Sequence, residues 1–543
     1  MRTEFIRIYK SVHTWTGILS GLALFIAFYA GALTVFKEEI VRWAAPPAAI
    51  AATDLAQAHE LIARTLAEHP EAARDFKLHL QPAEHLPAPM SWSIKPPDAD
   101  EHDSLAGRHY LATLDAAGLP AVSETQPSQL GELIDILHRV VGLPFDNDPN
   151  RWLMGVIAVL YALALISGVI VLLPSLVKDL FALRVGKNLK RMWLDAHNVV
   201  GFISLPFHVV FALTAAVFAF HDGLYALQDH LLYDGRIKEM LRPVGGAKPQ
   251  ARSFDPATML PPAELVARVQ AVVPDFVPDT LQYLQATGPR PVVRVWGHDP
   301  QAISPRAPGG FAVVDPYGGR LLSTDYLPGK QDAASTTVSS FFALHFATFG
   351  GTPVRWMYFL LGLAGAWLFY SGNLLWIESR RRKQRAENAA PEQRRDFRLL
   401  GALTIGTCLG CISGISFAIV AAKGLHGRVD DLNAWLWYVY YACFFAAIGW
   451  AFNRGAARAA VDLLWLSAGA TLAIPLSSLL ALLWPALGLW VNLSTASLGV
   501  DVTALLGSLA LAWMARETAR RARIGPQDSV WSDTQMRNRD TVS

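Results

Sequence analysis

Four histidines of this 543-residue chain occur in two matched pairs. His13 and His197 each begin the pattern H-x-x-x-G-x-x-S. His138 and His345 each follow a leucine and precede an Arg-Trp pair. Neutral imidazole is a common metal ligand, and a b-type haem in a membrane bundle takes one imidazole from each of two facing helices. The matched pairs therefore predict two haem b cofactors, with these four histidines as the axial ligands of the haem iron.

The same stretches of sequence indicate an internal repeat. The Arg-Trp pairs that begin at Arg151 and Arg355 are each followed, at the same distance, by a Ser-Gly pair, at Ser167 and Ser371. With the two H-x-x-x-G-x-x-S patterns, these anchors align the first and second apolar spans with the third and fourth. The alignment predicts a parallel two-fold repeat about an axis along the membrane normal, which would bring the members of each histidine pair together.

Long apolar runs place the elements that carry these residues in a membrane. The chain is 52% hydrophobic and only 17% charged, and a spanning helix needs roughly 20 mostly apolar residues. We therefore expect an all-α polytopic membrane bundle of eight transmembrane helices. The first (1–36 with its basic start) has too long an apolar run for a cleaved signal peptide. The predicted spans are about 13–36, 151–173, 197–220, 353–377, 398–422, 432–453, 459–484 and 494–515.

Basic residues predict the orientation of the spans. Cytoplasmic segments of membrane proteins carry an excess of lysine and arginine. Such residues gather at the N-terminus, in the loop 174–196, in the linker 378–397, at Arg454 and Arg458, and in the tail 516–543. Both termini are therefore expected in the cytoplasm. The two long connections, 37–150 and 221–352, then lie on the opposite side of the membrane.

Each outer connection has the pattern of a small α+β module. Amphipathic helices are expected at Asp54 to His69 and at Pro261 to Val273. Alternating apolar residues and turn signals then predict strands near 76–80, 91–95 and 109–115, and near 281–286, 291–297 and in a hairpin over 311–323. His138 and His345 fall on short surface helices after these strands, close to the outer ends of their spans.

Three further residues are candidates for contacts with haem. His208 is an alternative ligand for the outer haem, because it lies about 16 Å deeper than His197 on nearly the same helix face. Its repeat counterpart is Leu24, so it ranks behind the four paired histidines. Arg151 and Arg355 are either interfacial anchors or contacts to the haem propionates. The sequence identifies no catalytic residue.

Small residues in the spans favour close helix packing. Gly17 and Gly201 lie one turn after the inner histidines, where they would let a porphyrin lie flat against the helix. Cys408 and Cys411 resemble a redox pair by spacing alone. Because they lie inside an apolar span, we interpret them as packing residues.

Several partners are excluded by what the chain lacks. The net charge is only +2, so no nucleic-acid partner is expected. The cytoplasmic connections are too short for a nucleotide-binding domain, and no G-x-G-x-x-G motif follows a strand. Electrons for the haems would therefore come from a separate donor, either quinol or a cytoplasmic reductase.

These features resemble the PepSY-associated transmembrane proteins, which include PiuB-like iron-regulated proteins and FoxB-like ferric-siderophore reductases of Gram-negative inner membranes. The resemblance covers about residues 1–380, and Phe311 to Leu321 is similar to the strand-turn-strand ending of a PepSY module. It implies a multi-pass inner-membrane protein with periplasmic PepSY-like modules, which passes electrons through two b haems to a ferric-siderophore. The four paired histidines would take the ligand positions.

Two other functions stay open at this point. A haem-free PepSY regulator would bind a periplasmic protein, and a transporter subunit would move the siderophore or iron itself. The last four spans, residues 398–515, extend beyond the resemblance. They would dock a partner, bind quinol or enlarge the bundle.

Overall fold

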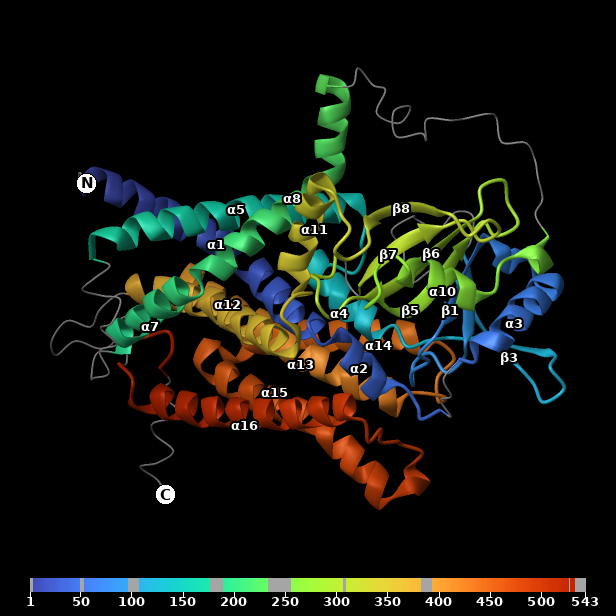
Figure 1. Ribbon diagram of the computed structural model, residues 1–543. Helices are drawn as coiled ribbons and strands as arrows, with labels where there is room; N and C mark the ends of the chain where they lie inside the picture. The colour runs from blue at the N-terminus through green and yellow to red at the C-terminus, as the bar shows by residue number, and fades with distance from the viewer. Residues whose placement is uncertain are drawn as a thin grey trace, which may run out of the picture. The chain divides into compact units, whose positions relative to one another are not determined.

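The computed structural model describes residues 3–48, 53–95, 107–175, 189–232, 255–305, 309–381, 393–526 and 528–532 (Figure 1). The chain forms two compact units. The first, here called the helical unit, comprises Met1–Pro46, Ser128–Ala219 and Met357–Ser543. The second, here called the sheet unit, comprises Pro47–Pro127 and Phe220–Trp356.

Seven helices in the described residues are each long and apolar enough to cross a membrane. They are α1 (Thr3–Thr34), α5 (Asp148–Leu172), α12 (Gly351–Ser379), α13 (Arg395–Gly424), α14 (Leu432–Arg454), α15 (Ala456–Leu483) and α16 (Thr495–Ile524). Each coincides with one of the eight predicted spans. The chain is thus a helical polytopic membrane protein.

The remaining predicted span, 197–220, is not one straight helix. It is a pair, α7 (Leu189–Ile203) and α8 (Leu205–Leu232), bent by 66° at Ser204. The bent pair makes an eighth span if its two parts cross together. Pro206 explains the break, because proline lacks a backbone N–H and its ring clashes with the carbonyl one turn earlier. The expectation of a continuous helix here was wrong.

Glycines bring α13 and α14 into close contact. A Cβ atom at Gly406 would lie 2.6 Å from the Ile448 Cα, and one at Gly410 would lie 3.1 Å from the Phe444 carbonyl oxygen. This spacing of small residues every four positions is typical of tightly packed membrane helices. Cys408 lies between these glycines, buried and outside any disulfide, in keeping with its interpretation as a packing residue.

A buried polar cluster joins the last helices to α2 (Lys37–Ala44). The Lys423 ammonium lies 3.6 Å from the Trp43 ring centroid and donates to the Ser478 hydroxyl at 3.1 Å. The Asp501 carboxylate accepts from the Trp43 indole at 2.8 Å and from Ser478 at 3.1 Å. Charged groups are costly in an apolar bundle unless they find such partners. The cluster therefore fixes α2 against α13, α15 and α16.

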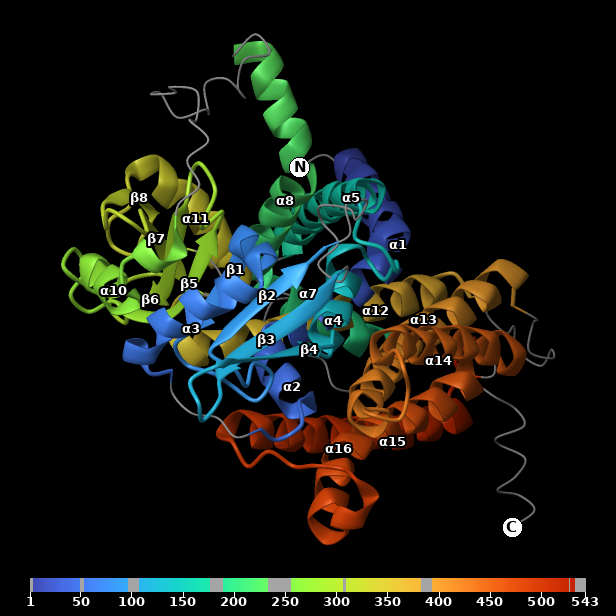
Figure 2. The same ribbon diagram turned by 90° about the vertical axis from the view of Figure 1, so that its right-hand side faces the viewer.

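The strands of the two long connections, 37–150 and 221–352, form one antiparallel sheet of eight strands, in the order β4-β3-β2-β1-β5-β6-β7-β8 (Figure 2). The first connection gives β1 (Asp75–His79), β2 (Met90–Ile94), β3 (Arg108–Leu114) and β4 (Pro120–Thr125). The second gives β5 (Val277–Leu284), β6 (Val292–His298), β7 (Gly310–Val314) and β8 (Leu321–Tyr326). The predicted strands are present, and β4 is additional.

One core explains why the two expected modules are halves of a single sheet. Phe76 on β1 pairs with Tyr283 on β5, and their buried rings stack with centroids 4.5 Å apart. Helices α3 (Leu55–Glu68) and α10 (Pro262–Gln270), one from each half, contribute to the same apolar cluster. Two separate modules would expose the apolar residues that β1 and β5 bury at this junction.

Two other helices precede spans along the chain, α4 (Leu130–Arg139) before α5 and α11 (Ala333–Phe346) before α12. Helix α4 lies in the helical unit, and α11 lies in the sheet unit. Short 3₁₀ helices occur at Pro70–Arg74, Leu173–Ser175, Pro256–Thr258 and Pro485–Leu487. Helices α4 and α11 carry His138 and His345 respectively, as the sequence predicts.

A glycine substitution tests the α13–α14 contact. We expect Gly406→Leu to lower the free energy of unfolding by about 2–3 kcal/mol or more, because its side chain would collide with the α14 backbone. Thermal unfolding of the full chain in detergent measures the change. Gly449→Leu on α14 is the control, since no described atom lies within 4 Å of its Cβ position. Equal stabilities of the two variants would contradict the contact.

The sheet unit should lose stability in acid through His79. Burial, aided by Lys77 and His85, lowers the pKa of His79 from 6.5 to about 4. The unfolded chain therefore takes up a proton first as the pH falls. Stability is fully present above pH 6.5 and is lost toward pH 4, by up to about 3 kcal/mol.

Amide exchange of β1 and β2 in the full chain, corrected for intrinsic rates, measures this loss. His79→Gln can keep the hydrogen bond that the ring makes to Ser91 at 2.7 Å, and should remove most of the pH dependence. His298→Gln is the control, because the His298 side chain is 46% exposed. An unchanged pH profile in His79→Gln would refute the assignment.

Candidate functional site

His13 of α1 lies against the Ser-Gly segment of α5. Its Nδ1 is 2.8 Å from the Ala164 carbonyl oxygen, and a Cβ atom at Gly168 would lie 3.0 Å from the ring. A carbonyl oxygen only accepts hydrogen bonds, so Nδ1 carries the proton. The lone pair of the neutral ring is then on Nε2, the nitrogen that can bind a metal.

His197 of α7 lies against the Ser-Gly segment of α12 in the same way. Its Nδ1 is 3.1 Å from the Ser371 hydroxyl, and a Cβ atom at Gly372 would lie 3.5 Å from the ring. The Ser371 hydroxyl donates to the Leu368 carbonyl at 3.2 Å, so it accepts from His197. The lone pair of this ring is again on Nε2.

The surroundings of these two rings fit a flat iron-bound group. His13 and His208 are both close enough to His197 for their rings to interact electrostatically with it. Among the described residues, no hydrogen-bond partner meets Nε2 of His13 or His197. No described atom lies within 4 Å of a Cβ position at Gly17, and the nearest to Gly201 is 3.9 Å away. Two available imidazole nitrogens, with open space beside Gly17, are what bis-histidine ligation requires.

His208 of α8 is the most deeply buried of the candidate histidines, with 1% of its surface exposed. Its Nδ1 is hydrogen-bonded to the Tyr161 hydroxyl. Its Nε2 is buried and meets no hydrogen-bond partner among the described residues. An unsatisfied buried polar atom costs about 1–3 kcal/mol, so such an atom indicates a missing partner. The aromatic rings around it belong to Phe28, Tyr161, Phe207 and, beyond Phe28, Phe211 and Phe369.

Tyr161 and Gly365 occupy equivalent positions in the two aligned sequences, and both contact the His208 ring. Tyr161 and Gly365 follow their Arg-Trp pairs by the same number of residues. Tyr161 hydrogen-bonds the His208 ring, whereas a Cβ atom at Gly365 would lie 3.1 Å from the same ring. The tyrosine orients the imidazole and the glycine makes room for it.

His138 of α4 contacts the C-terminal part of α1. Its Nδ1 donates to the Ala27 carbonyl at 2.8 Å, and a Cβ atom at Gly31 would lie 2.6 Å from that nitrogen. Burial lowers the pKa of His138, so the ring is neutral at pH 7 and suited to bind a metal. Phe28, next to Ala27, contacts the His208 ring at 5.6 Å between centroids. His138 and His208 therefore reach α1 at the same level.

The other predicted contacts have different surroundings. His345 belongs to the sheet unit, where its half-buried ring lies 5.3 Å from that of Phe346. Arg355, near the start of α12, is also half-buried. Arg151 makes two hydrogen bonds to the Asp146 carboxylate, at 2.7 and 3.0 Å. The Arg151 guanidinium thus anchors the loop between α4 and α5.

Asn373 is a site residue that sequence reasoning missed. Its side chain is buried, and its amide nitrogen has no hydrogen-bond partner among the described residues. It follows Gly372 on α12, and its Oδ1 would lie 3.2 Å from a Cβ atom at Gly21 on α1. An asparagine inside an apolar span was the available signal, because such groups are rare there and mark functional positions.

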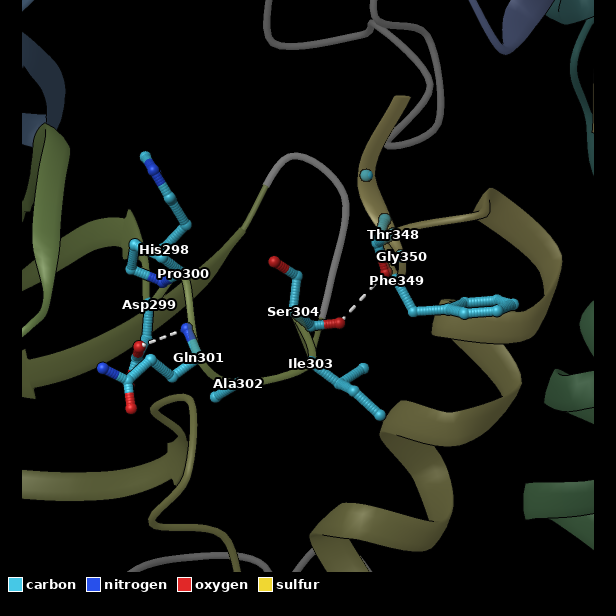
Figure 3. Close-up of a pocket in the computed structure, with 11 residues that line it drawn as sticks. His298, Asp299, Pro300, Gln301, Ala302, Ile303, Ser304, Thr348, Phe349 and Gly350 are labelled. Atoms are coloured by element: carbon cyan, nitrogen blue, oxygen red, sulfur yellow. Dashed lines mark hydrogen bonds between the residues drawn. The ribbon is translucent and has the colours of Figure 1, made fainter. Parts of the chain in front are cut away.

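The rest of the described chain offers weaker sites. No group of three or more histidine, cysteine, aspartate or glutamate side chains could hold a metal ion there. The sheet unit has a polar pocket of about 320 Å³ between the loop after β6 and the turn before α12 (Figure 3). Across it, the Thr348 hydroxyl donates to the Ser304 carbonyl at 3.0 Å. One lining residue, His298, has its Nδ1 3.2 Å from the Asp279 carboxylate, and both side chains are more than 40% exposed.

Comparison with known protein families gives a match over the first two-thirds of the chain. The model of the PepSY-associated TM region matches residues 10–379, which include all five candidate histidines. A comparison with curated proteins finds no match. The matched range ends with α12, so α13 to α16 lie outside it. On this match, the chain belongs to the PepSY-associated transmembrane family.

Proposed function

We propose that this protein is a di-haem b electron-transfer protein of the bacterial inner membrane, which reduces a periplasmic ferric-siderophore or another Fe(III) complex for iron uptake. The observation that carries the proposal is the common orientation of the histidines in the helical unit. His13, His138 and His197 donate from Nδ1 to the protein, and the buried Nε2 of His208 lacks a partner. This is the arrangement that holds ligating imidazoles in place.

His13 and His197 are the proposed ligands of the inner haem. Their similar contacts with the Ser-Gly segments of α5 and α12 support the parallel two-fold repeat of the first four spans. The open surface at Gly17 gives a porphyrin room beside His13. The unpartnered Asn373 amide would donate a hydrogen bond in the same region.

The outer haem takes two ligands from His138, His208 and His345. We favour His138 and His208, because both contact α1 at the same level. The Nε2 of His208 also has no hydrogen-bond partner among the described residues. On this proposal His345, which the sequence predicts as a ligand, is not one of the haem ligands. Variants at positions 208 and 345 distinguish the two assignments.

A b-type haem, when bound, supplies reversible one-electron transfer. The protein's own part is to hold the imidazoles in the orientation that ligation needs, through the hydrogen bonds at Nδ1. Fe(III) in the periplasmic complex gains one electron and becomes Fe(II), which siderophores bind far less tightly. The electron comes from quinol or from a cytoplasmic reductase, and the sheet unit is the proposed periplasmic part.

The proposed ligands are tested by a reduction assay. Purified protein is reduced anaerobically, excess reductant is removed, and a ferric hydroxamate is added with a colorimetric Fe(II) chelator. We expect about two Fe(II) per chain from the wild type, and about one from His13→Ala or His208→Ala, because each variant loses one haem. His345→Ala should behave as the wild type. Loss of haem in His345→Ala, but not in His208→Ala, would restore His345 as the ligand.

Reoxidation without Fe(II) would contradict the iron reductase activity while leaving the haem assignment intact. A stable, colourless wild-type protein with a periplasmic partner would favour the regulator instead.

The room at Gly17 gives a second test. Gly17→Leu should lower the amount of haem per chain severalfold while the thermal stability of the haem-free protein stays unchanged, because no described atom contacts this position. Gly469→Leu on α15 is the matched control, since its Cβ position is equally open. Pyridine haemochrome spectra measure haem per chain. Full haem content in Gly17→Leu would show that no haem lies against this face.

A further inference from the structure

Helix α4, which carries His138, is held at both of its ends by α14. The backbone N–H of Gln129, just before α4, donates to the Asn433 Oδ1 at 2.8 Å. The Tyr441 hydroxyl donates to the Gly142 carbonyl, just after α4, at 2.9 Å. Both contacts lie within the helical unit.

The spacing of the two contacts matches the length of α4. Asn433 and Tyr441 are about two turns apart on α14, which places them about 12 Å apart along its axis. Helix α4 has 10 residues and is therefore about 15 Å long. One straight helix can thus contact both ends of α4 at once.

The C-terminal end of α4 needs such a contact. Val141 has φ 51° and Gly142 has φ 90°, so two successive residues take the left-handed conformation. This conformation is strained for a β-branched residue and persists only where neighbouring groups enforce it. The Gly142 N–H donates a hydrogen bond to the Leu137 carbonyl at 2.9 Å. The Gly142 carbonyl accepts a hydrogen bond from the Tyr441 hydroxyl. His138 lies in this last turn.

Helix α2 adds a second link between α4 and the last four spans. The Lys37 ammonium pairs with Glu132 and Asp135 on α4. The other end of α2 carries Trp43, which donates to Asp501 of α16 at 2.8 Å. Helix α4 is therefore held by the C-terminal helices directly, through α14, and indirectly, through α2.

We propose that the C-terminal four-helix extension positions His138 for its haem, with Asn433 and Tyr441 as the positioning residues. This inference rests on the proposed function, since it assigns His138 a metal to bind. It gives residues 398–515 a role that needs neither a docked partner nor a quinol. The contacts fix where α4 ends, and with it the direction of the His138 ring toward the iron.

A purely structural role for Tyr441 can be separated from positioning. The ring of Tyr441 stacks between Trp437 and Phe445, with centroids 5.8 and 5.9 Å away. Tyr441→Phe keeps this packing and removes only the hydroxyl that reaches Gly142. Tyr438→Phe is the matched control, because Tyr438 lies on the same helix with 62% of its surface exposed.

The experiment combines redox titration with amide exchange on the full-length protein. In Tyr441→Phe we expect two haems per chain, a shifted midpoint potential for one of them and an unchanged potential for the other. Amide exchange in α4 should rise about fivefold, because one hydrogen bond contributes about 1 kcal/mol. Asn433→Ala should act in the same direction, and Asn433→Asp, which keeps an acceptor oxygen, should restore the wild-type potential.

The outcomes separate this inference from the proposed function. Two haems with unchanged potentials in Tyr441→Phe and Asn433→Ala would overturn the positioning role and leave the haem assignment standing. A haem-free wild type would remove the proposed function, and the positioning of His138 for a haem would fall with it. Equal potential shifts in Tyr438→Phe would show that the effect does not come from the Gly142 contact.

Discussion

The hydrogen bond that three of the proposed ligands make from Nδ1 is the constraint on which the geometry of the helical unit depends. For His13, His138 and His197 the acceptor is an oxygen on a neighbouring helix or on α1, and this fixes both the tautomer and the direction of the ring. The acceptor is reached only where the facing residue is small, as at Gly168 and Gly31. Glycines therefore occupy the positions that face the histidine rings. These glycines also determine how closely the helices approach each other.

Burial of polar groups joins the four C-terminal spans to the rest of the helical unit. Trp43 of α2 lies over the Lys423 ammonium and donates to the Asp501 carboxylate, so separating α2 from the extension would remove one partner from each of these buried charges. The Asn433 and Tyr441 contacts hold α4 in the same way. The extension lies outside the family match, yet its polar contacts end on the helices that precede and carry His138.

Local sequence signals predicted the seven straight spans, the amphipathic helices α3 and α10, and most strands. Each of these elements depends on hydrophobic periodicity and on nearby turn residues. Three features of the structure go beyond these predictions. The bend at Ser204 follows from Pro206, which cannot supply the backbone N–H that a continuous helix needs there. The β1–β5 junction pairs Phe76 with Tyr283, far apart in sequence, which no periodicity reveals. The absence of a partner at the His208 Nε2 depends on the residues packed around it in the described structure, which the sequence alone does not reveal. Sequence reasoning therefore placed His208 behind the paired histidines.

The reduced-minus-oxidised absorption spectrum of the purified wild-type protein, with haem quantified per chain, tests the central claim most directly. We expect the spectrum of low-spin b-type haem at two haems per chain, because the proposed ligands would supply two imidazoles to each iron. A correctly folded protein from haem-replete cells that shows no haem absorption would contradict it.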